Sequence, residues 1–168
     1  ESIYKEKIRG NISASSYSTV ASDREDRHRL MSRLSFNAEH IRDSKFSFNT
    51  YVNYRHILDE ATTSSLQNNS FLRVYNLGVR YDAMPTFSIT IGRNINPKIS
   101  SIGAIDGLQA EKYFGKSYVG VIVGFRPDIF DYGFNADLLQ YGGYIGTATK
   151  NKNSYTQTTL GFVEQRNG

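Results

Sequence analysis

The feature that most constrains the fold of this chain is a strict alternation of two kinds of side chain over most of its length. The segment 30–39 shows it clearly. Its apolar parity holds Leu30, Leu34, Phe36 and Ala38, and its polar parity holds Arg33, Ser35, Asn37 and Glu39. Because successive side chains of a β-strand point to opposite faces, a period of two predicts strands with one apolar and one polar face.

The same alternation predicts how neighbouring strands pair. With a turn at 42–44, Ala38 pairs with Phe48 and Leu34 with Val52 on the apolar face, whereas Arg33 faces Asn53. A second hairpin with its turn at 83–85 follows the same rule. It pairs Tyr81 with Phe87, Val79 with Ile89 and Leu77 with Ile91, and it pairs Arg80 with Ser88 on the polar face. Each parity class therefore meets its own kind, which favours antiparallel hairpins in this register.

The whole chain is predicted to form nine strands joined by connections that are alternately long and short. The strands are expected at 9–21, 28–41, 45–57, 71–82, 86–94, 106–114, 117–126, 134–148 and 153–164. The long connections are 22–27, 58–70, 95–105 and 127–133, and the short turns are 42–44, 83–85, 115–116 and 149–152. This alternation is typical of outer-membrane barrels, which have long extracellular loops and short periplasmic turns.

Composition supports a β-barrel in a membrane over a helical membrane protein. The chain has 12 Tyr, 10 Phe and no Cys, its mean hydropathy is −0.47, and no stretch approaches the apolar length of a membrane helix. In a barrel only alternate residues meet lipid, so a moderate mean hydropathy is compatible with spanning strands. Several predicted strands also reach the roughly nine to eleven residues that a tilted spanning strand needs.

We therefore predict an all-β fold, an antiparallel up-and-down transmembrane β-barrel. Residues 1–168 are expected to form a single barrel segment that continues beyond residue 168, because nine is an odd number and bacterial single-chain barrels close with an even one. A complete small barrel of eight strands is the competing interpretation of the length.

The segment 92–128, GRNINPKISSIGAIDGLQAEKYFGKSYVGVIVGFRPD, resembles porin-like outer-membrane barrels of Gram-negative bacteria. In those proteins a strand ending in Gly-Arg leads through a loop to Asp-Gly and the next strand, which pairs with a Val/Gly-rich one. The resemblance covers about 40 residues closely, and many proteins of this kind have no assigned function. It implies a location in the bacterial outer membrane, in contact with its lipid and lipopolysaccharide. The expected final strand ending in an aromatic residue is missing, which leaves the width of any pore open.

If the apolar parity faces lipid, the polar parity faces the lumen. The predicted lumen-lining residues are Arg33, Asn37, Glu39, Asn53, Arg55, Arg80, Asp82, Asn135 and Asp137. Charges at such positions set conductance and ion preference in a pore. We expect a porin-like passive channel for small polar or ionic solutes, or the membrane component of an envelope complex with protein partners. In a narrow barrel the same residues would instead pair with one another and fill the interior.

Other chemistries have weaker support in the sequence. His40 is expected at the opposite end of its hairpin from His28 and His56, so the three cannot converge on a metal, and we expect no cofactor and no enzymatic activity. The net charge of +4 is spread over many segments, which argues against nucleic-acid binding. Two alternatives stay open. One is a secreted or periplasmic β-sandwich that binds carbohydrate, and the other is an outer-membrane hydrolase using a serine with His40 or His56.

Overall fold

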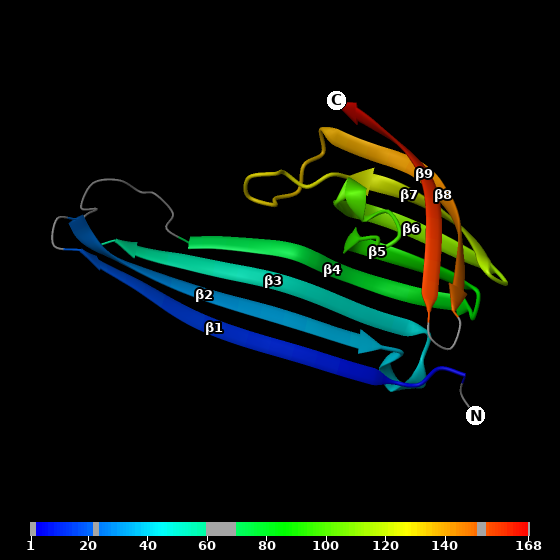
Figure 1. Cartoon of the computed structure of the whole chain (residues 1–168), viewed down its shortest axis with the longest axis horizontal. Helices are drawn as coiled ribbons and strands as arrows, with labels where there is room; N and C mark the ends of the chain where they lie inside the picture. Colours follow the sequence, from blue (N-terminus) through cyan, green and yellow to red (C-terminus); the bar gives the residue numbers. More distant parts are fainter. Residues whose placement is uncertain (1–2, 22–23, 60–69, 151–153, 168) are drawn as a thin grey trace.

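The computed structural model describes residues 3–21, 24–59, 70–150 and 154–167, which form one antiparallel sheet (Figure 1). Its strands are β1 (Lys7–Ala21), β2 (Arg24–Glu39), β3 (Phe46–Asp59), β4 (Ser70–Met84), β5 (Phe87–Ile95), β6 (Ala104–Phe114), β7 (Ser117–Phe125), β8 (Leu138–Lys150) and β9 (Tyr155–Asn167). Short 3₁₀ turns lie at η1 (Ile41–Asp43) and η2 (Ser100–Ile102). Each strand pairs with its neighbours in sequence, from β1 to β9. The predicted all-β, up-and-down antiparallel architecture is confirmed.

The register of the first predicted hairpin is also confirmed. Ala38 is opposite Phe48, Leu34 is opposite Val52, and Arg33 is opposite Asn53. Apolar and polar residues therefore meet their own kind between β2 and β3, as the alternation required.

The predicted register of the β4–β5 hairpin is wrong by two residues. Tyr81 lies opposite Ile89 and Val79 opposite Ile91, because the turn is at 85–86 and an irregularity between Asp82 and Met84 adds a residue to β4. A shift of two keeps every side chain on its predicted face, whereas a shift of one would have exchanged the faces.

Three predicted connections differ from the structure. The segment SDREDR, 22–27, was expected to be a long loop, but β2 begins at Arg24, so the strict alternation of long and short connections does not hold. The first short turn is longer than predicted and runs from 40 to 45. Strand β8 begins at Leu138, so 134–137 belongs to the connection before it. The predicted connection 58–70 mostly covers residues 60–69, which lie outside the described residues.

The described sheet is open, and it does not close into a barrel. Strand β1 pairs with β2 and β9 with β8, and no pairing joins β1 to β9. The described strands form one continuous sheet, which contradicts both the complete eight-stranded barrel and the two-sheet sandwich. Among these residues no helix is long and apolar enough to cross a membrane.

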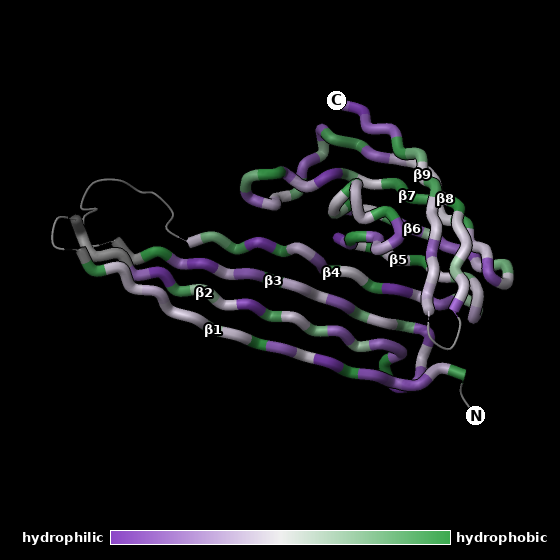
Figure 2. The backbone as a smooth tube through the Cα atoms, in the orientation of Figure 1, coloured by the Kyte–Doolittle hydropathy of each residue, from purple (hydrophilic) through white to green (hydrophobic). Residues whose placement is uncertain are grey.

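The two faces of the sheet have an inverted distribution of polarity, and β7 shows it most clearly. Val119, Val121 and Val123 are exposed, whereas the alternate residues from Tyr118 to Gly124 are buried. Elsewhere Leu34, Leu77 and Ile91 are exposed, and Gln109 and Gln140 are buried. Figure 2 shows the alternation of hydrophobic and hydrophilic residues along the strands. A sheet of a soluble protein buries its apolar face, whereas this sheet exposes its apolar face and covers much of its polar face.

The polar face is concave. One hollow is lined by Asn49 of β3, Arg80 of β4, Tyr144 of β8 and Gln157 of β9. In a flat sheet β3 and β9 would be about 29 Å apart, at roughly 4.8 Å per strand, so the sheet must curl for both to reach one hollow. Figure 1 shows β8 and β9 rising out of the plane of β1–β4.

A row of glycines crosses the curled part of the sheet. Gly78, Gly92, Gly107 and Gly124 lie opposite one another on β4, β5, β6 and β7. A Cβ atom at Gly107 would lie 2.2 Å from the Val123 carbonyl oxygen, and Gly92 has φ +110°. The backbones approach too closely here for any side chain, and glycine kinks of this kind let a designed or natural sheet bend.

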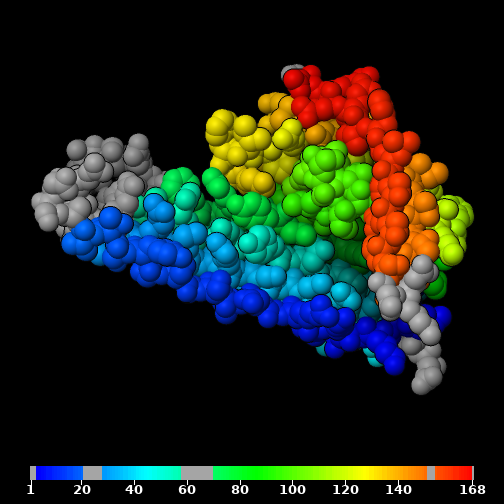
Figure 3. Space-filling model, viewed as in Figure 1, coloured from blue at the N-terminus to red at the C-terminus, as the bar shows by residue number. Residues whose placement is uncertain are grey.

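Two walls can be distinguished. The long wall is β1–β4, with strands of 14–16 residues, and the packed wall is β5–β9, with strands of 9–13 residues and nearly all of the buried apolar residues. In Figure 3 the blue and cyan surface of the long wall extends well beyond the packed wall.

Candidate functional site

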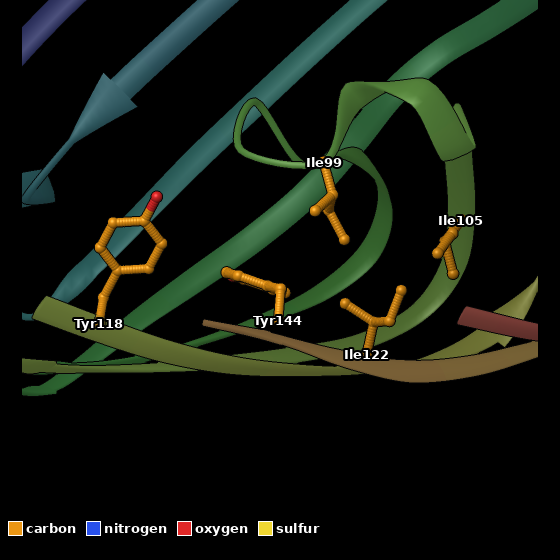
Figure 4. Packing of buried hydrophobic residues seen from close by; sticks show 5 residues of the cluster. All are labelled: Ile99, Ile105, Tyr118, Ile122 and Tyr144. Atoms are coloured by element: carbon orange, nitrogen blue, oxygen red, sulfur yellow. The ribbon is translucent and has the colours of Figure 1, made fainter. Parts of the chain in front are cut away.

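The connection between β5 and β6, residues 96–103, folds onto the concave face of the packed wall and defines the candidate site. Ile99 points from this connection toward Tyr144 and Ile122, which come from β8 and β7 (Figure 4). Ile105 and Tyr118 complete this small buried cluster. We call residues 96–103 the inward loop. It has an apolar anchor although it covers a largely polar face.

Buried hydrogen bonds hold the start of the inward loop. The Asn96 amide donates from Nδ2 to the Gln109 Oε1 at 3.2 Å and to the Tyr144 hydroxyl oxygen at 2.8 Å. The Tyr144 hydroxyl in turn donates to a Glu111 carboxylate oxygen at 2.6 Å. Asn96 and Gln109 are both buried, so each would cost free energy without its partner.

An ion pair holds the next residue of the inward loop. The Lys98 ammonium donates to the Glu111 carboxylate and to the Tyr113 hydroxyl, and it lies 4.3 Å from the centroid of the Tyr118 ring. Burial alone would lower the pKa of Lys98, but the hydrogen bonds and the charge of Glu111 outweigh it and hold that pKa above its ordinary value. Lys98 therefore stays charged in its place over the packed wall.

The packed wall accommodates these groups through paired tyrosines and glycines. Tyr144 is opposite Gly120, and Tyr118 is opposite Gly146. A Cβ at Gly120 would lie 2.1 Å from the Tyr144 ring, and one at Gly146 would lie 2.4 Å from the Tyr118 hydroxyl oxygen. Each ring therefore covers the glycine of the facing strand, an arrangement that restores packing where a glycine has no side chain.

Beside the inward loop lies the polar hollow, a space of about 420 Å³. Its lining is almost entirely polar or aromatic: Asn49, Arg80, Ser88, Thr90, Asn94, Asn96, Pro97, Lys98, Gln109, Glu111, Tyr113, Tyr144, Tyr155 and Gln157. The lining combines donors, acceptors and aromatic rings, with a cation and an anion already paired at Lys98 and Glu111. Such a surface can form hydrogen bonds with water and with polar molecules.

Seven of the nine predicted lumen-lining residues lie on this concave face. Arg33, Asn37, Glu39, Asn53 and Arg55 occupy the polar parity of β2 and β3. Arg80 lines the polar hollow, and its guanidinium lies 2.7 Å from the Asp82 carboxylate, which is buried. These seven residues keep the facing that the alternation assigned to them.

The placement of Asn135 and Asp137 was based on a strand that does not exist at those residues. Both lie in the connection 126–137, where the Asn135 side chain accepts a hydrogen bond from the Asp137 N–H at 2.9 Å. The alternation argument does not apply to them. Asn135 acts as a local turn residue, which is a common role of asparagine in loops.

Sequence reasoning missed the residues that hold the inward loop. Asn96 and Lys98 lay in a segment predicted only as a long connection, and Glu111 and Tyr144 lay in strands whose alternation was weak. One signal was present: the segment 95–105 contains four isoleucines, at 95, 99, 102 and 105. An exposed loop needs no such apolar residues, so they could have indicated a loop that packs against the sheet.

The connection 126–137 covers the edge of β4 beyond the end of β5. The Arg93 side chain forms an ion pair with Asp106 at 2.5 Å and donates to the carbonyl oxygens of Val74 and Tyr132. Arg73 donates to the Phe130 carbonyl oxygen at 3.0 Å. The two arginine side chains therefore tie the backbone of the connection to β4 and β5, and Arg93 also satisfies the Val74 carbonyl of β4.

In the described structure His40 lies at the opposite end of the β2–β3 hairpin from His28 and His56. Among the described residues no group of three or more His, Asp or Glu side chains is arranged to hold a metal ion. His56 Nδ1 is 2.7 Å from the Ser70 hydroxyl, and His28 Nδ1 is 2.8 Å from the Ser18 hydroxyl. Both pairs are exposed, and no carboxylate of the described residues forms an ion pair with either histidine. The orienting member of a catalytic triad is therefore not seen in either pair.

Comparison with known proteins does not assign the chain to a family. No protein-family model matches it, and neither a curated protein nor a solved structure is significantly similar. The resemblance of residues 92–128 to porin-like barrels stays a prediction that rests on the sequence pattern.

Proposed function

We propose that this chain forms the wall of a porin-like β-barrel in a bacterial outer membrane and lines a passive channel for small polar or ionic solutes. The observation that carries the proposal is the inverted sheet: the convex face has exposed aliphatic side chains, and the concave face has polar side chains, of which Gln109, Gln140 and Asp82 are buried. Lipid is the solvent in which such a convex face is favourable, because apolar atoms lose nothing there.

Aromatic side chains at the strand ends support the same proposal. Near the short turns, the ring centroids of Phe46 and Tyr81 are 4.9 Å apart. Phe114, at the end of β6 beside another short turn, is exposed on the same face. At the opposite end of the strands, the ring centroids of Phe125 and Phe134 are 5.5 Å apart. Aromatic residues at both rims of an aliphatic band are typical of membrane-spanning barrels.

The open edges belong to the proposal too. Unpaired N–H and C=O groups at the edges of β1 and β9 would each cost several kcal/mol in hydrocarbon. A membrane form therefore needs further strands to pair with both edges and close the cylinder. The inward loop and the polar hollow would then lie inside it and narrow the passage.

Conductance in a planar lipid bilayer tests the proposal. Purified full-length protein should insert and produce discrete, reproducible current steps in potassium chloride. A preparation that inserts into the bilayer and gives no conductance under any voltage or salt condition would contradict the channel function.

A further inference from the structure

On the concave face of β2, β3 and β4, four arginines have no acidic partner among the described residues. We call them the arginine strip: Arg29 and Arg33 of β2, Arg55 of β3 and Arg73 of β4. Arg33 and Arg73 face Asn53 from either side, which places them in one row across three strands. Arg55 and Arg73 also line a cleft of about 60 Å³ with Asn53.

Two other cations of the concave face have acidic partners, since Arg80 pairs with Asp82 and Lys98 pairs with Glu111. On β1, Lys7 lies opposite Glu39 and Arg9 lies opposite Asn37, and neither cation forms an ion pair with a described carboxylate. In the described part of the chain no carboxylate lies within ion-pair distance of the arginine strip. The positive charge of the strip is therefore uncompensated.

Unused hydrogen-bond donors accompany this charge. The Nε atoms of Arg29 and Arg73 are shielded from solvent and have no hydrogen-bond partner among the described residues. Shielded donors of this kind are costly unless a ligand or an ordered water occupies them. A guanidinium presents its donors in a planar fork that matches carboxylate and phosphate oxygens.

The packed wall does not offset the strip. On the concave parity of its described strands the one carboxylate is Glu111, which Lys98 already neutralises. The polar residues around it are neutral, among them Gln109, Gln140 and Gln157. A cleft lined by one sign of charge raises the local concentration of counter-ions, roughly tenfold or more at low salt.

From this arrangement we infer that the pore is selective for anions, and that the arginine strip collects small solutes bearing a carboxylate or a phosphate group. This inference rests on the proposed channel function and adds the substrate class. The cleft beside Asn53 has room for one small anionic head group, and the guanidinium groups of Arg55 and Arg73 border it.

The reversal potential of the full-length protein across a potassium chloride gradient tests the inference. At low salt, chloride should be roughly tenfold more permeant than potassium, and the ratio should decrease as salt screens the strip. Inorganic phosphate added to one side should reduce the chloride current, since it competes for the same guanidinium groups.

The test variant replaces three strip residues, Arg33→Gln, Arg55→Gln and Arg73→Gln. The matched control removes the same charge elsewhere, through Lys112→Gln, Lys116→Gln and Arg166→Gln. The strip variant should conduct with a chloride-to-potassium ratio near one and no phosphate block, and the control should keep both properties.

Different results overturn different claims. A conducting pore that prefers potassium, or a strip variant with unchanged selectivity, would overturn the inference and leave the channel standing. Insertion without conductance would overturn the channel and the inference together.

Discussion

The long wall and the packed wall come from the same alternating pattern, yet they differ in what their concave faces contact. The packed wall is covered by the inward loop, and its concave face holds a buried cluster around Ile122 and Tyr144. The concave face of the long wall carries the arginine strip, and no apolar residue on that face is buried in the described chain; Ala38, the buried apolar residue of the described long wall, belongs to the opposite face. The concave face of the packed wall is therefore buried under a loop, whereas the concave face of the long wall presents positive charge to the space in front of it.

This difference shows that one part of a continuous sheet can hold a packed loop while another part carries charged side chains. Glycines and tyrosines allow the packed wall to bend and to hold a loop, whereas the longer strands of the long wall carry charges apart from that loop. The comparison can be tested by substitutions that should act in one wall and not in the other.

The largest effect is expected from Gly107→Ala in the packed wall. The new Cβ would lie 2.2 Å from the Val123 carbonyl oxygen, so the two strands would have to separate. We expect a loss of roughly 3 kcal/mol in the free energy of unfolding, measured by urea denaturation in detergent micelles. Gly10→Ala in the long wall is the control, since its Cβ would make an ordinary contact at 3.5 Å with Phe36. Its stability should be unchanged or higher by about 0.5 kcal/mol; equal losses in both variants would contradict the difference between the walls.

Ile99→Ala should weaken the attachment of the inward loop. Ile99 is buried against Tyr144 and Ile122, and removing its outer carbons leaves a cavity that costs about 2 kcal/mol. Faster proteolysis within 96–103 and a lower unfolding midpoint should both follow. Ile129→Ala removes the same atoms from an exposed position in the connection 126–137 and should have no measurable effect. A loop that is cleaved no faster in Ile99→Ala would show that this contact does not hold it.

Tyr144→Phe removes one hydroxyl from the buried network. The Asn96 amide would lose an acceptor and Glu111 a donor, which should destabilise the packed wall by about 1 kcal/mol. Tyr155→Phe is the matched control, because its hydroxyl donates to Gln157 in an exposed position and should contribute little. Denaturation curves of the two variants that coincide would argue against a structural role for the network.

The smallest effect is expected from high pH acting on Lys98. Its folded-state pKa is raised above the ordinary 10.5, so its pairing with Glu111 stabilises the fold at and below that pH. The contribution disappears as pH rises through the folded-state pKa. Proteolysis of the inward loop should therefore increase more steeply above about pH 10.5 in the native protein than in Lys98→Gln, whose loop should already be looser at neutral pH. Parallel pH profiles would contradict this role.

Much of the fold could be predicted from the sequence, because alternation reports directly which face a strand residue occupies. Arg33, Asn53 and Val52 have the partners expected from that rule. Alternation does not mark the turns, so their positions could not be predicted as well. Placing the turn at 83–85 shifted the predicted register of the β4–β5 hairpin by two residues. The segment 22–27 was predicted as a connection because its charged residues show no apolar parity, but β2 already begins at Arg24.

The candidate site was predicted only in part. The alternation predicts the face of the sheet on which Arg80 and Asp82 lie. It predicts neither the ion pair between them nor the packing of the inward loop. Contacts such as Asn96 with Tyr144 join residues 48 positions apart, and they depend on how far the sheet curls. That curvature is set by close backbone contacts at glycines, which a sequence pattern does not reveal.

The central claim, that the apolar parity faces lipid, can be tested with a single fluorescent side chain. The chain contains no tryptophan, so one substitution gives an unambiguous signal. Val121→Trp places the indole on the convex face, and Ser35→Trp places it on the concave face. After reconstitution of the full-length protein, brominated lipid should strongly quench Val121→Trp and spare Ser35→Trp, which aqueous iodide should quench instead. Quenching of Ser35→Trp by brominated lipid, or of Val121→Trp by iodide alone, would contradict the account.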